Sequence, residues 1–239
     1  MKNTKYANIR GVIHARGGSV RLPLKNIKRL CGKPLISYMI KAALESRLLG
    51  RVIVSTDHPK IKAAALKYGG EVPFSRPENI SGDCASTLVT QHAAYFIEKK
   101  EGKKIDIIVT LQPTSPFCKG SDIDECIKLL LRNKNLGSVF SAVEITEYPE
   151  WMFTLKGRNK AEPYIPGRWN GKRALRRYLN KMVVPNGAIY ATRRDNLFKE
   201  NALITKMTAA YLMPRERSVD IDEKLDFEFA EFMAKKRKL

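Results

Sequence analysis

Acidic residues are scarce in this sequence of 239 residues, which holds 24 Asp and Glu against 44 Lys and Arg. The formal net charge is therefore +20 at pH 7. Such an excess indicates a partner rich in negative charge, namely nucleic acid, anionic lipid, or small phosphates and carboxylates. The basic residues are clustered, because ten of them precede the first acidic residue, Glu45, and nine lie between Lys156 and Lys181.

Cysteine is also rare, and its spacing excludes the common disulfide and metal patterns. The four cysteines form no C-x-x-C pair and have no His at ligand intervals. We expect free thiols in a reducing compartment and no zinc site. No apolar run approaches the ~18 residues that a membrane span needs, and the first residues lack the apolar core of a signal peptide. These absences predict a cytoplasmic protein with no membrane partner.

The rest of the composition, 44% apolar and 28% charged, is that of a globular protein. Apolar runs alternate with segments of helical periodicity. The pattern predicts strands over residues 9–15, 51–56, 105–111, 138–143, 188–192 and 209–213, and helices over 34–46, 59–68, 86–99, 121–132 and 222–235. Near-continuous apolar strands between helices are typical of a parallel sheet covered on both faces. The fold class is therefore α/β, a three-layer α/β/α sandwich around a mostly parallel, Rossmann-like sheet.

The alternation degrades between Trp151 and Pro185, a stretch rich in Gly, Pro, Asn and basic residues. We interpret residues 1–239 as a single domain that carries an insertion at about 151–185. Trp151 and Trp169 lie among the cations of this insertion, which would suit stacking on nucleic-acid bases. The insertion could equally cover a small acidic ligand or pair with a second subunit, and we favour this interpretation.

The first predicted strand runs into a long loop that carries two glycines and three cations. Gly17 and Gly18 allow backbone N–H groups to approach an anion closely, and Arg16, Arg21 and Lys25 supply positive charge. Neither G-x-x-x-x-G-K-[ST] nor G-x-G-x-x-G is present. A loop of this kind suits a triphosphate that is wrapped by the chain, although a solvated Gly-rich turn explains the composition about as well.

Two carboxylates lie close together near the end of the chain. Asp220 and Asp222 are separated by one residue, and in an extended chain such residues share a face. Both could therefore bind one hard cation such as Mg²⁺. Alternatively, Asp222 caps the last helix. In so basic a protein, a carboxylate pair that brings Mg²⁺ to a polyphosphate is the hypothesis that we carry forward.

Seven segments in order resemble the acylneuraminate cytidylyltransferases, that is the CMP-sialic acid synthetases and their relatives that act on legionaminic or pseudaminic acid. The segments are ARGGSVRLPLKN from residue 15, CGKPLISY from 31, VSTD from 54, RPENISGDCAST from 76, LQPTSP from 111, PNGAIY from 185 and DIDEKLD from 220. The match is collinear over most of the chain. It departs from the family at Val20, where lysine is frequent, at His14, where proline is common, and at Val183 and Val184.

The resemblance implies a fold of the nucleotide-diphospho-sugar transferase type and a homodimeric, Mg²⁺-dependent enzyme, with Mn²⁺ as a substitute. Such an enzyme joins CTP to a nine-carbon 2-keto sugar acid and releases pyrophosphate. No nucleic acid is then expected as a partner. A synthetase for the eight-carbon acid Kdo remains an alternative, as do a basic nucleic-acid-binding protein and a non-catalytic relative.

The resemblance also implies roles for residues at matching positions. Nucleotide contacts are implied for Ala15, Arg16, Gly17, Gly18, Ser19, Lys25, Asn26, Arg76 and Ser86. Contacts to the acceptor sugar are implied for Gln112, Arg176 and Tyr190, and Arg176 would offer a sugar carboxylate the fork geometry of a guanidinium. Metal binding is implied for Asp220 and Asp222. Catalysis is implied for Arg16, Lys25 and Asp222.

Overall fold

The structure is a computed structural model that describes residues 8–237. It divides into two compact units, one made of Met1–Ala142 and Pro185–Leu239 and the other of Val143–Val184. The second unit begins at Val143, before the insertion expected from Trp151 onward. Within residues 8–237, no helix is long and apolar enough to cross a membrane.

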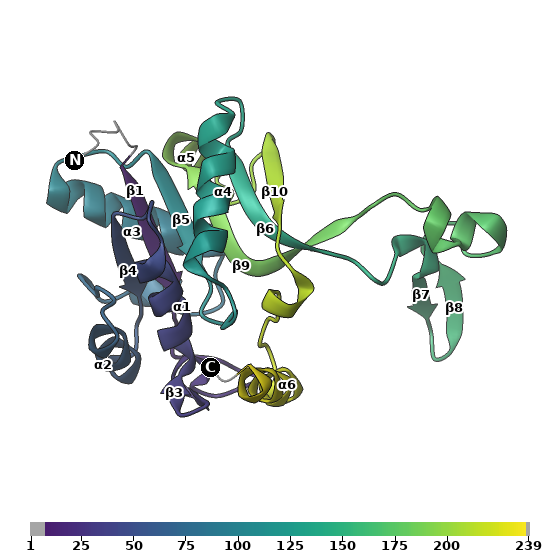
Figure 1. Ribbon diagram of the computed structural model, residues 1–239, viewed down its shortest axis with the longest axis horizontal. Coiled ribbons are helices and arrows are strands. Elements are labelled where there is room, and N and C mark those ends of the chain that lie inside the picture. Colours follow the sequence, from purple (N-terminus) through teal and green to yellow (C-terminus); the bar gives the residue numbers. More distant parts are fainter. Residues whose placement is uncertain (1–7, 238–239) are drawn as a thin grey trace. The chain divides into compact units, whose positions relative to one another are not determined.

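A six-stranded sheet forms the centre of the first unit, with the order β10-β6-β9-β5-β1-β4 (Figure 1). Its strands are β1 (Ile9–His14), β4 (Arg51–Ser55), β5 (Ile107–Leu111), β6 (Ser138–Glu144), β9 (Val183–Arg193) and β10 (Thr208–Leu212). β1 pairs in parallel with β4 and β5, and β10 pairs in parallel with β6. β9 pairs antiparallel with β5. The prediction of a mostly parallel α/β sheet is therefore confirmed.

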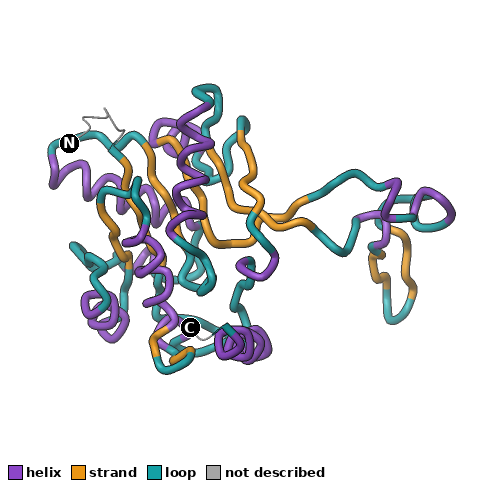
Figure 2. The backbone as a smooth tube through the Cα atoms, viewed as in Figure 1, coloured by secondary structure: helices purple, strands orange, loops and turns teal. Residues whose placement is uncertain are grey.

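Helices cover both faces of this sheet, which gives the three layers (Figure 2). Alternation along the strands divides the core, because Val109 packs with one cluster of buried side chains and Ile108 with another. The first cluster includes side chains of α1 (Leu35–Glu45), α2 (Pro59–Lys67) and α4 (Gly120–Arg132). The second includes side chains of α3 (Ser86–Glu101) and α5 (Arg194–Glu200).

The closing helix α6 (Lys224–Lys236) packs through Phe227, Ala230 and Ala234 on a third cluster. This cluster includes Leu30 of β2 (Arg29–Leu30), which forms a short antiparallel pair with β3 (Lys33–Pro34). The remaining short elements of the first unit are the 3-10 turns η1 (Lys25–Ile27), η2 (Glu78–Ile80) and η6 (Arg215–Arg217).

Ser121 and Asp124 have the S-x-x-D spacing of a capping box, but α4 begins before them, at Gly120. The capping residue is Lys119, whose backbone N–H donates to Asp122 Oδ2 at 3.0 Å. Asp124 instead accepts the hydroxyl of Ser46 at 2.5 Å. An aspartate can serve either a helix end or a tertiary contact, and sequence spacing alone did not separate the two.

The second unit contains an antiparallel pair, β7 (Phe153–Lys156) and β8 (Lys160–Pro163), and three 3-10 turns. The turns are η3 (Pro149–Trp151), η4 (Gly171–Ala174) and η5 (Arg176–Tyr178). The indole N–H of Trp151 donates to the carbonyl of Ala174 at 2.6 Å, which ties the first turn to the second. Many large apolar side chains of this unit are exposed, namely Met152, Phe153, Leu155, Tyr164, Trp169, Leu175, Tyr178, Met182, Val183 and Val184.

Candidate active site

A pocket of about 590 Å³ opens where β1 and β5 end. This is the carboxyl edge of the parallel strands, where ligands of open α/β sheets bind. The pocket is lined by His14, Arg16, Ser19, Val20, Arg21, Leu22, Lys25, Asn26, Asp83, Gln112, Pro113, Thr114, Gly187, Tyr190, Asp220 and Asp222. Every cation of this lining comes from the segment 16–25, and every carboxylate comes from elsewhere in the chain. The pocket thus combines positive charge from one segment with hard oxygen ligands from other segments.

Hydrogen bonds to the neighbouring strand fix the glycine loop that follows β1. The backbone N–H of Ala15 donates to the carbonyl of Ser55 at 3.0 Å, and that of Gly17 donates to Asp57 Oδ1 at 2.8 Å. A Cβ atom at position 17 would lie 2.8 Å from the His58 ring, so the loop takes this path only with glycine. Gly18 has open space around it. Ala15 and Gly17 therefore shape the loop, and none of Ala15, Gly17 and Gly18 is part of the pocket lining.

Hydrogen bonds fix both the side chain and the backbone of Arg16. Arg16 donates to the carbonyl of Gly82 at 2.7 Å and reaches Asp83 Oδ1 at 3.4 Å. Its own carbonyl accepts a hydrogen bond from Asn26 Nδ2 at 2.9 Å, whereas Asn26 Oδ1 is buried without a partner among the described residues. Asn26 thus fixes the backbone of Arg16 and retains one unused acceptor beside the pocket.

Lys25 connects this loop to the two carboxylates. Its ammonium donates to the carbonyl of Ile221 at 2.6 Å and to Asp222 Oδ1 at 3.1 Å. The last helix is capped by Glu223 and begins at Lys224, so the alternative that Asp222 is its cap is wrong. Asp222 is 60% exposed on the pocket side of this ion pair.

Asp220 precedes Asp222 by two residues in the segment that joins η6 to α6. It keeps an exposed face, yet the protein packed around its carboxyl displaces water and raises its pKa. Gly187 makes room for it, because a Cβ atom there would lie 2.8 Å from Asp220 Oδ2. Gly187 also has a φ of +79°, a backbone conformation that favours glycine. The carboxylate of Asp220 therefore requires a glycine at position 187 of β9.

The two aspartates suit Mg²⁺ better than a metal that needs a complete protein cage. Within residues 8–237, no group of three or more metal-ligating side chains comes together. Mg²⁺ is commonly bound by one or two carboxylates, and water and substrate phosphates complete its octahedron. The two carboxylates would supply the protein ligands of this set, and the cationic loop beside them would hold the phosphates that supply others.

Two of the residues expected at the acceptor sugar also line the pocket. Gln112 follows β5, and its backbone N–H donates to the carbonyl of Ala188 at 3.1 Å. Tyr190 lies opposite Thr110 in the β5–β9 ladder, and burial, followed by the charge of Asp220, raises the pKa of its hydroxyl. The antiparallel β9 thereby brings a phenol and a glycine to an edge otherwise built from parallel strands.

Besides Ala15, Gly17 and Gly18, three further expected site residues do not line the pocket. Arg76 is 6% exposed and donates through Nη2 to the carbonyl of Ser55 at 2.6 Å, so part of its guanidinium is used to hold the end of β4. Ser86 is the first residue of α3. Arg176 belongs to the second unit, where it lies 3.6 Å from the carboxylate of Glu144.

The pocket lining also contains residues to which the sequence interpretation gave no role, namely His14, Val20, Leu22, Asp83, Pro113, Thr114 and Gly187. All of them except His14 lie inside the quoted motifs, so their neighbours already marked the segments. His14 immediately precedes the first motif, and its polar character at the end of an apolar strand was the available signal.

Comparison with known proteins agrees with this geometry. A family model described as cytidylyltransferase matches residues 11–157. Pseudaminic acid cytidylyltransferase of Campylobacter jejuni is 32% identical over 94% of this chain and 95% of its own length. CMP-N,N'-diacetyllegionaminic acid synthase of Legionella pneumophila is 32% identical over 93% of this chain and 94% of its own length. Among solved structures, a CMP:2-keto-3-deoxy-manno-octonic acid synthetase complexed with CTP aligns with a TM-score of 0.70, at 21% identity, over 97% of this chain and all of the other.

The fold and the pocket together define the class of protein, an α/β nucleotidyltransferase. Within this class, the chain belongs to the cytidylyltransferase family. The likeness to the solved structure concerns the fold alone, because the identity is low.

Proposed function

We propose that this enzyme transfers the cytidylyl group of CTP to a nonulosonic acid, a nine-carbon 2-keto sugar acid, and releases pyrophosphate. The observation that carries the proposal is the division of charge in one pocket. The cations of segment 16–25 face Asp220 and Asp222, and Lys25 Nζ lies 3.1 Å from Asp222 Oδ1. A metal–triphosphate complex presents the complementary pattern, with anionic oxygens for the loop and a divalent cation for the aspartates.

In the proposed reaction, the anomeric 2-hydroxyl of the sugar acid attacks the α-phosphorus of CTP. A bond forms between the sugar oxygen and phosphorus, the bond to the β-phosphate oxygen breaks, pyrophosphate leaves, and the hydroxyl proton passes to solvent or a nearby base. Arg16 and Lys25 would neutralise charge that develops on the phosphates. Holding both substrates in line would supply much of the remaining acceleration.

Mg²⁺ would be held by Asp220 and Asp222, with Mn²⁺ as a substitute. When bound, it would polarise the phosphoryl oxygens and neutralise their charge. Lys25 Nζ lies 3.1 Å from Asp222 Oδ1, so it competes with a metal ion for that oxygen. Lys25 would then turn toward the triphosphate when the nucleotide and the metal arrive together.

The nature of the acceptor is supported by two observations. Relatives that match over nearly their whole length are named for pseudaminic acid and N,N'-diacetyllegionaminic acid. Gln112 and Tyr190 add an amide and a phenol to the pocket, which are groups that bind sugar hydroxyls. Arg176 is proposed to bind the sugar carboxylate, for which its planar fork is suited.

We further propose that the enzyme is a homodimer that associates through the second unit. Leu155 is 73% exposed, Tyr164 64% and Phe153 47%, and all three lie on or next to the β7–β8 pair. Apolar surface of this extent is typical of an interface between subunits. Leu155→Glu is expected to shift the protein toward monomer in sedimentation velocity. Lys160→Glu is the matched control on the same hairpin, and dimer formation by the Leu155 variant would contradict this interface.

The test of the reaction is pyrophosphate release with CTP and Mg²⁺ across a panel of sialic, legionaminic, pseudaminic and Kdo-type acids. Turnover with one or more nine-carbon acids, and none with the Kdo-type acid, is the expected result. Turnover confined to the Kdo-type acid would contradict the acceptor class. Folded protein that neither binds CTP nor releases pyrophosphate would contradict the whole proposal.

A further inference from the structure

His14 is a polar residue at the floor of the pocket that the proposed reaction does not use. It ends β1 and is only 8% exposed, yet it belongs to the pocket lining. Its Nε2 lies 3.1 Å from the hydroxyl of Thr90, which lies 2.9 Å from the hydroxyl of Thr110. Thr90 and Thr110 are completely buried, so this is a built polar chain inside an apolar layer.

Counting the hydrogens of this chain fixes the tautomer of His14. The Thr90 hydroxyl has three partners, because it also lies 3.0 Å from the carbonyl of Ser86. A carbonyl can only accept, so the single hydrogen of Thr90 goes to Ser86. Thr90 then accepts from Thr110 and from His14, which satisfies all three contacts only if the proton of the imidazole is on Nε2. His14 Nδ1 therefore carries a lone pair and is an acceptor.

This acceptor is available to a ligand. His14 Nδ1 makes no hydrogen bond within residues 8–237 and, unlike Nδ1 of His92, is not one of the fully enclosed unpaired atoms of that region. Burial, and then the charge of Arg76, lowers the pKa of His14 to about 3. The imidazole thus stays neutral, and its lone pair is retained, throughout the physiological range.

We infer that His14 Nδ1 accepts a hydrogen bond from the exocyclic amino group of the cytosine ring and thereby selects CTP over UTP. His14 is held by Thr90, one turn after Ser86 on α3, and lies within reach of the charge of Arg76. Ser86 and Arg76 are residues for which the family resemblance implies contacts to the cytidine part of the nucleotide, so the inference rests on the proposed function. Uracil has a carbonyl oxygen where cytosine has its amino group. The lone pair of that oxygen would face the lone pair of His14 Nδ1, and the two acceptors would repel each other.

Two substitutions separate the two ends of the imidazole. In His14→Gln, the amide nitrogen can still donate to Thr90, but the acceptor toward the pocket is removed. In His14→Asn, the shorter amide can replace Nδ1 but does not reach Thr90. His92→Gln, on a half-buried His of α3 outside the pocket, is the matched control. Thermal melts of each variant check the fold.

The measurement is the affinity for CTP and for UTP by calorimetry with Mg²⁺, which requires no acceptor sugar, followed by kcat/KM for each nucleotide. We expect His14→Gln to lower the CTP-to-UTP ratio by about 10- to 100-fold, mainly through weaker CTP binding, because a buried polar contact to the base is lost. His14→Asn should keep the ratio within about threefold of wild type, since an acceptor of similar strength remains.

An unchanged ratio in folded His14→Gln, or an equal loss for both nucleotides, would overturn the inference. A wild-type enzyme that binds CTP in preference to UTP but uses no nine-carbon acid would contradict the proposed acceptor and leave the role of His14 measurable by binding. Wild-type protein that binds neither nucleotide would contradict both proposals.

Discussion

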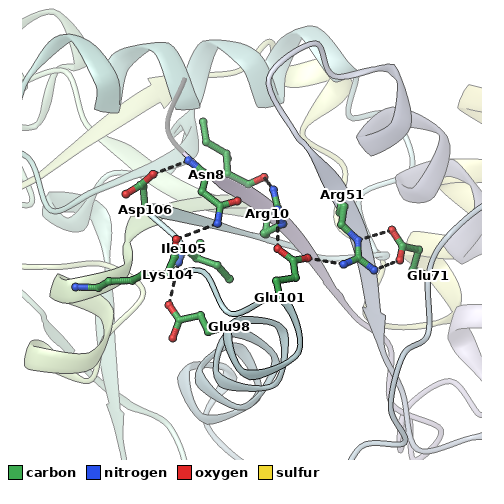
Figure 3. Close-up of polar contacts among 10 residues, drawn as sticks. Asn8, Arg10, Arg51, Glu71, Glu98, Glu101, Lys104, Ile105 and Asp106 are labelled. Carbon is green, nitrogen blue, oxygen red and sulfur yellow. Dashed lines mark hydrogen bonds and ion pairs between the residues drawn. The ribbon is translucent and has the colours of Figure 1, made fainter. Parts of the chain in front are cut away.

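The two edges of the central sheet use charge in opposite ways. At the amino edge, Arg10 pairs with Glu101 at 2.7 Å, and Arg51 pairs with both Glu101 and Glu71 (Figure 3). At the carboxyl edge, the cations lie on one segment and the carboxylates on others, and Arg21 has no ion-pair partner in the part of the chain that the structure describes.

The difference shows which charges serve the fold and which serve the ligand. Arg51, Glu71 and Glu101 are matched within the protein, and the hydrogen bonds of Glu71 and Glu101 raise the pKa of Arg51. Partly buried networks of this kind contribute more than isolated surface pairs. The carboxyl edge keeps its charges incompletely matched, and the proposed nucleotide and metal ion would complete them. Four predictions test this division.

The largest effect is expected at the proposed metal-binding pair, Asp220 and Asp222. Asp222→Asn removes a negative charge from a ligand of the proposed Mg²⁺ and should lower kcat by about 10³-fold, roughly 4 kcal/mol of transition-state stabilisation. The melting temperature should change little, because the side chain is 60% exposed. Steady-state kinetics over a Mg²⁺ titration check this, and full activity in the variant would remove the metal assignment.

Arg16→Ala should have the next largest effect. It removes a guanidinium from the proposed triphosphate site and should lower kcat/KM for CTP by about 10²-fold, with little change in the KM of the sugar acid. Arg29→Ala, an exposed arginine of β2 outside the pocket, is the control. Equal nucleotide parameters in wild type and the Arg16 variant would show that this cation is not part of the site.

At the amino edge, Glu101→Gln should reduce stability and leave catalysis unchanged. Glu101 is 17% exposed and serves two arginines, so its loss leaves both with an incomplete partner. We expect a decrease of about 1–3 kcal/mol in the free energy of unfolding. Urea titration and kcat/KM measured on the same preparation check it, and a change in kcat/KM at constant stability would break the distinction between the edges.

The smallest effect is a difference in acid sensitivity. The arginines lower the folded-state pKa of Glu71 and Glu101 below the unfolded value, which is about 4.3. Their contribution is therefore complete above the unfolded pKa and is lost as the pH falls through the lower folded-state pKa values. Between pH 6 and pH 3, the urea midpoint should fall less steeply in Glu101→Gln than in wild type, and parallel profiles would contradict the linkage.

Sequence patterns predicted the features that depend on neighbouring residues. Apolar runs located the strands, and the glycines and cations of segment 15–26 marked the loop that lines the pocket. Contacts between distant residues were not predictable in this way. The capping alternative for Asp222 could be rejected only once Glu223 was seen to cap α6. The hydrogen bond between His14 and Thr90 joins residues that no local pattern relates.

The direction of β9 and the charge network of the amino edge also could not be predicted from the sequence. Ala188–Thr192 has the apolar character of a buried strand whichever way it runs, so the pattern did not distinguish antiparallel from parallel pairing. Arg10, Arg51 and Glu101 are drawn from a chain rich in charged residues, and composition does not say which of them meet. Arg76 carried a motif signal, but its burial against Ser55 depends on tertiary packing.

The close approach of Gly187 to Asp220 limits how acceptor preference can be engineered. Position 187 lies on the strand that also presents Tyr190 to the pocket, which makes this strand an obvious target for mutagenesis libraries. Any side chain there would need a left-handed backbone and would push the carboxylate out of place. Libraries should therefore keep this glycine fixed. When a segment is replaced by that of a relative, the residues equivalent to Gly187 and Asp220 should both come from the same relative.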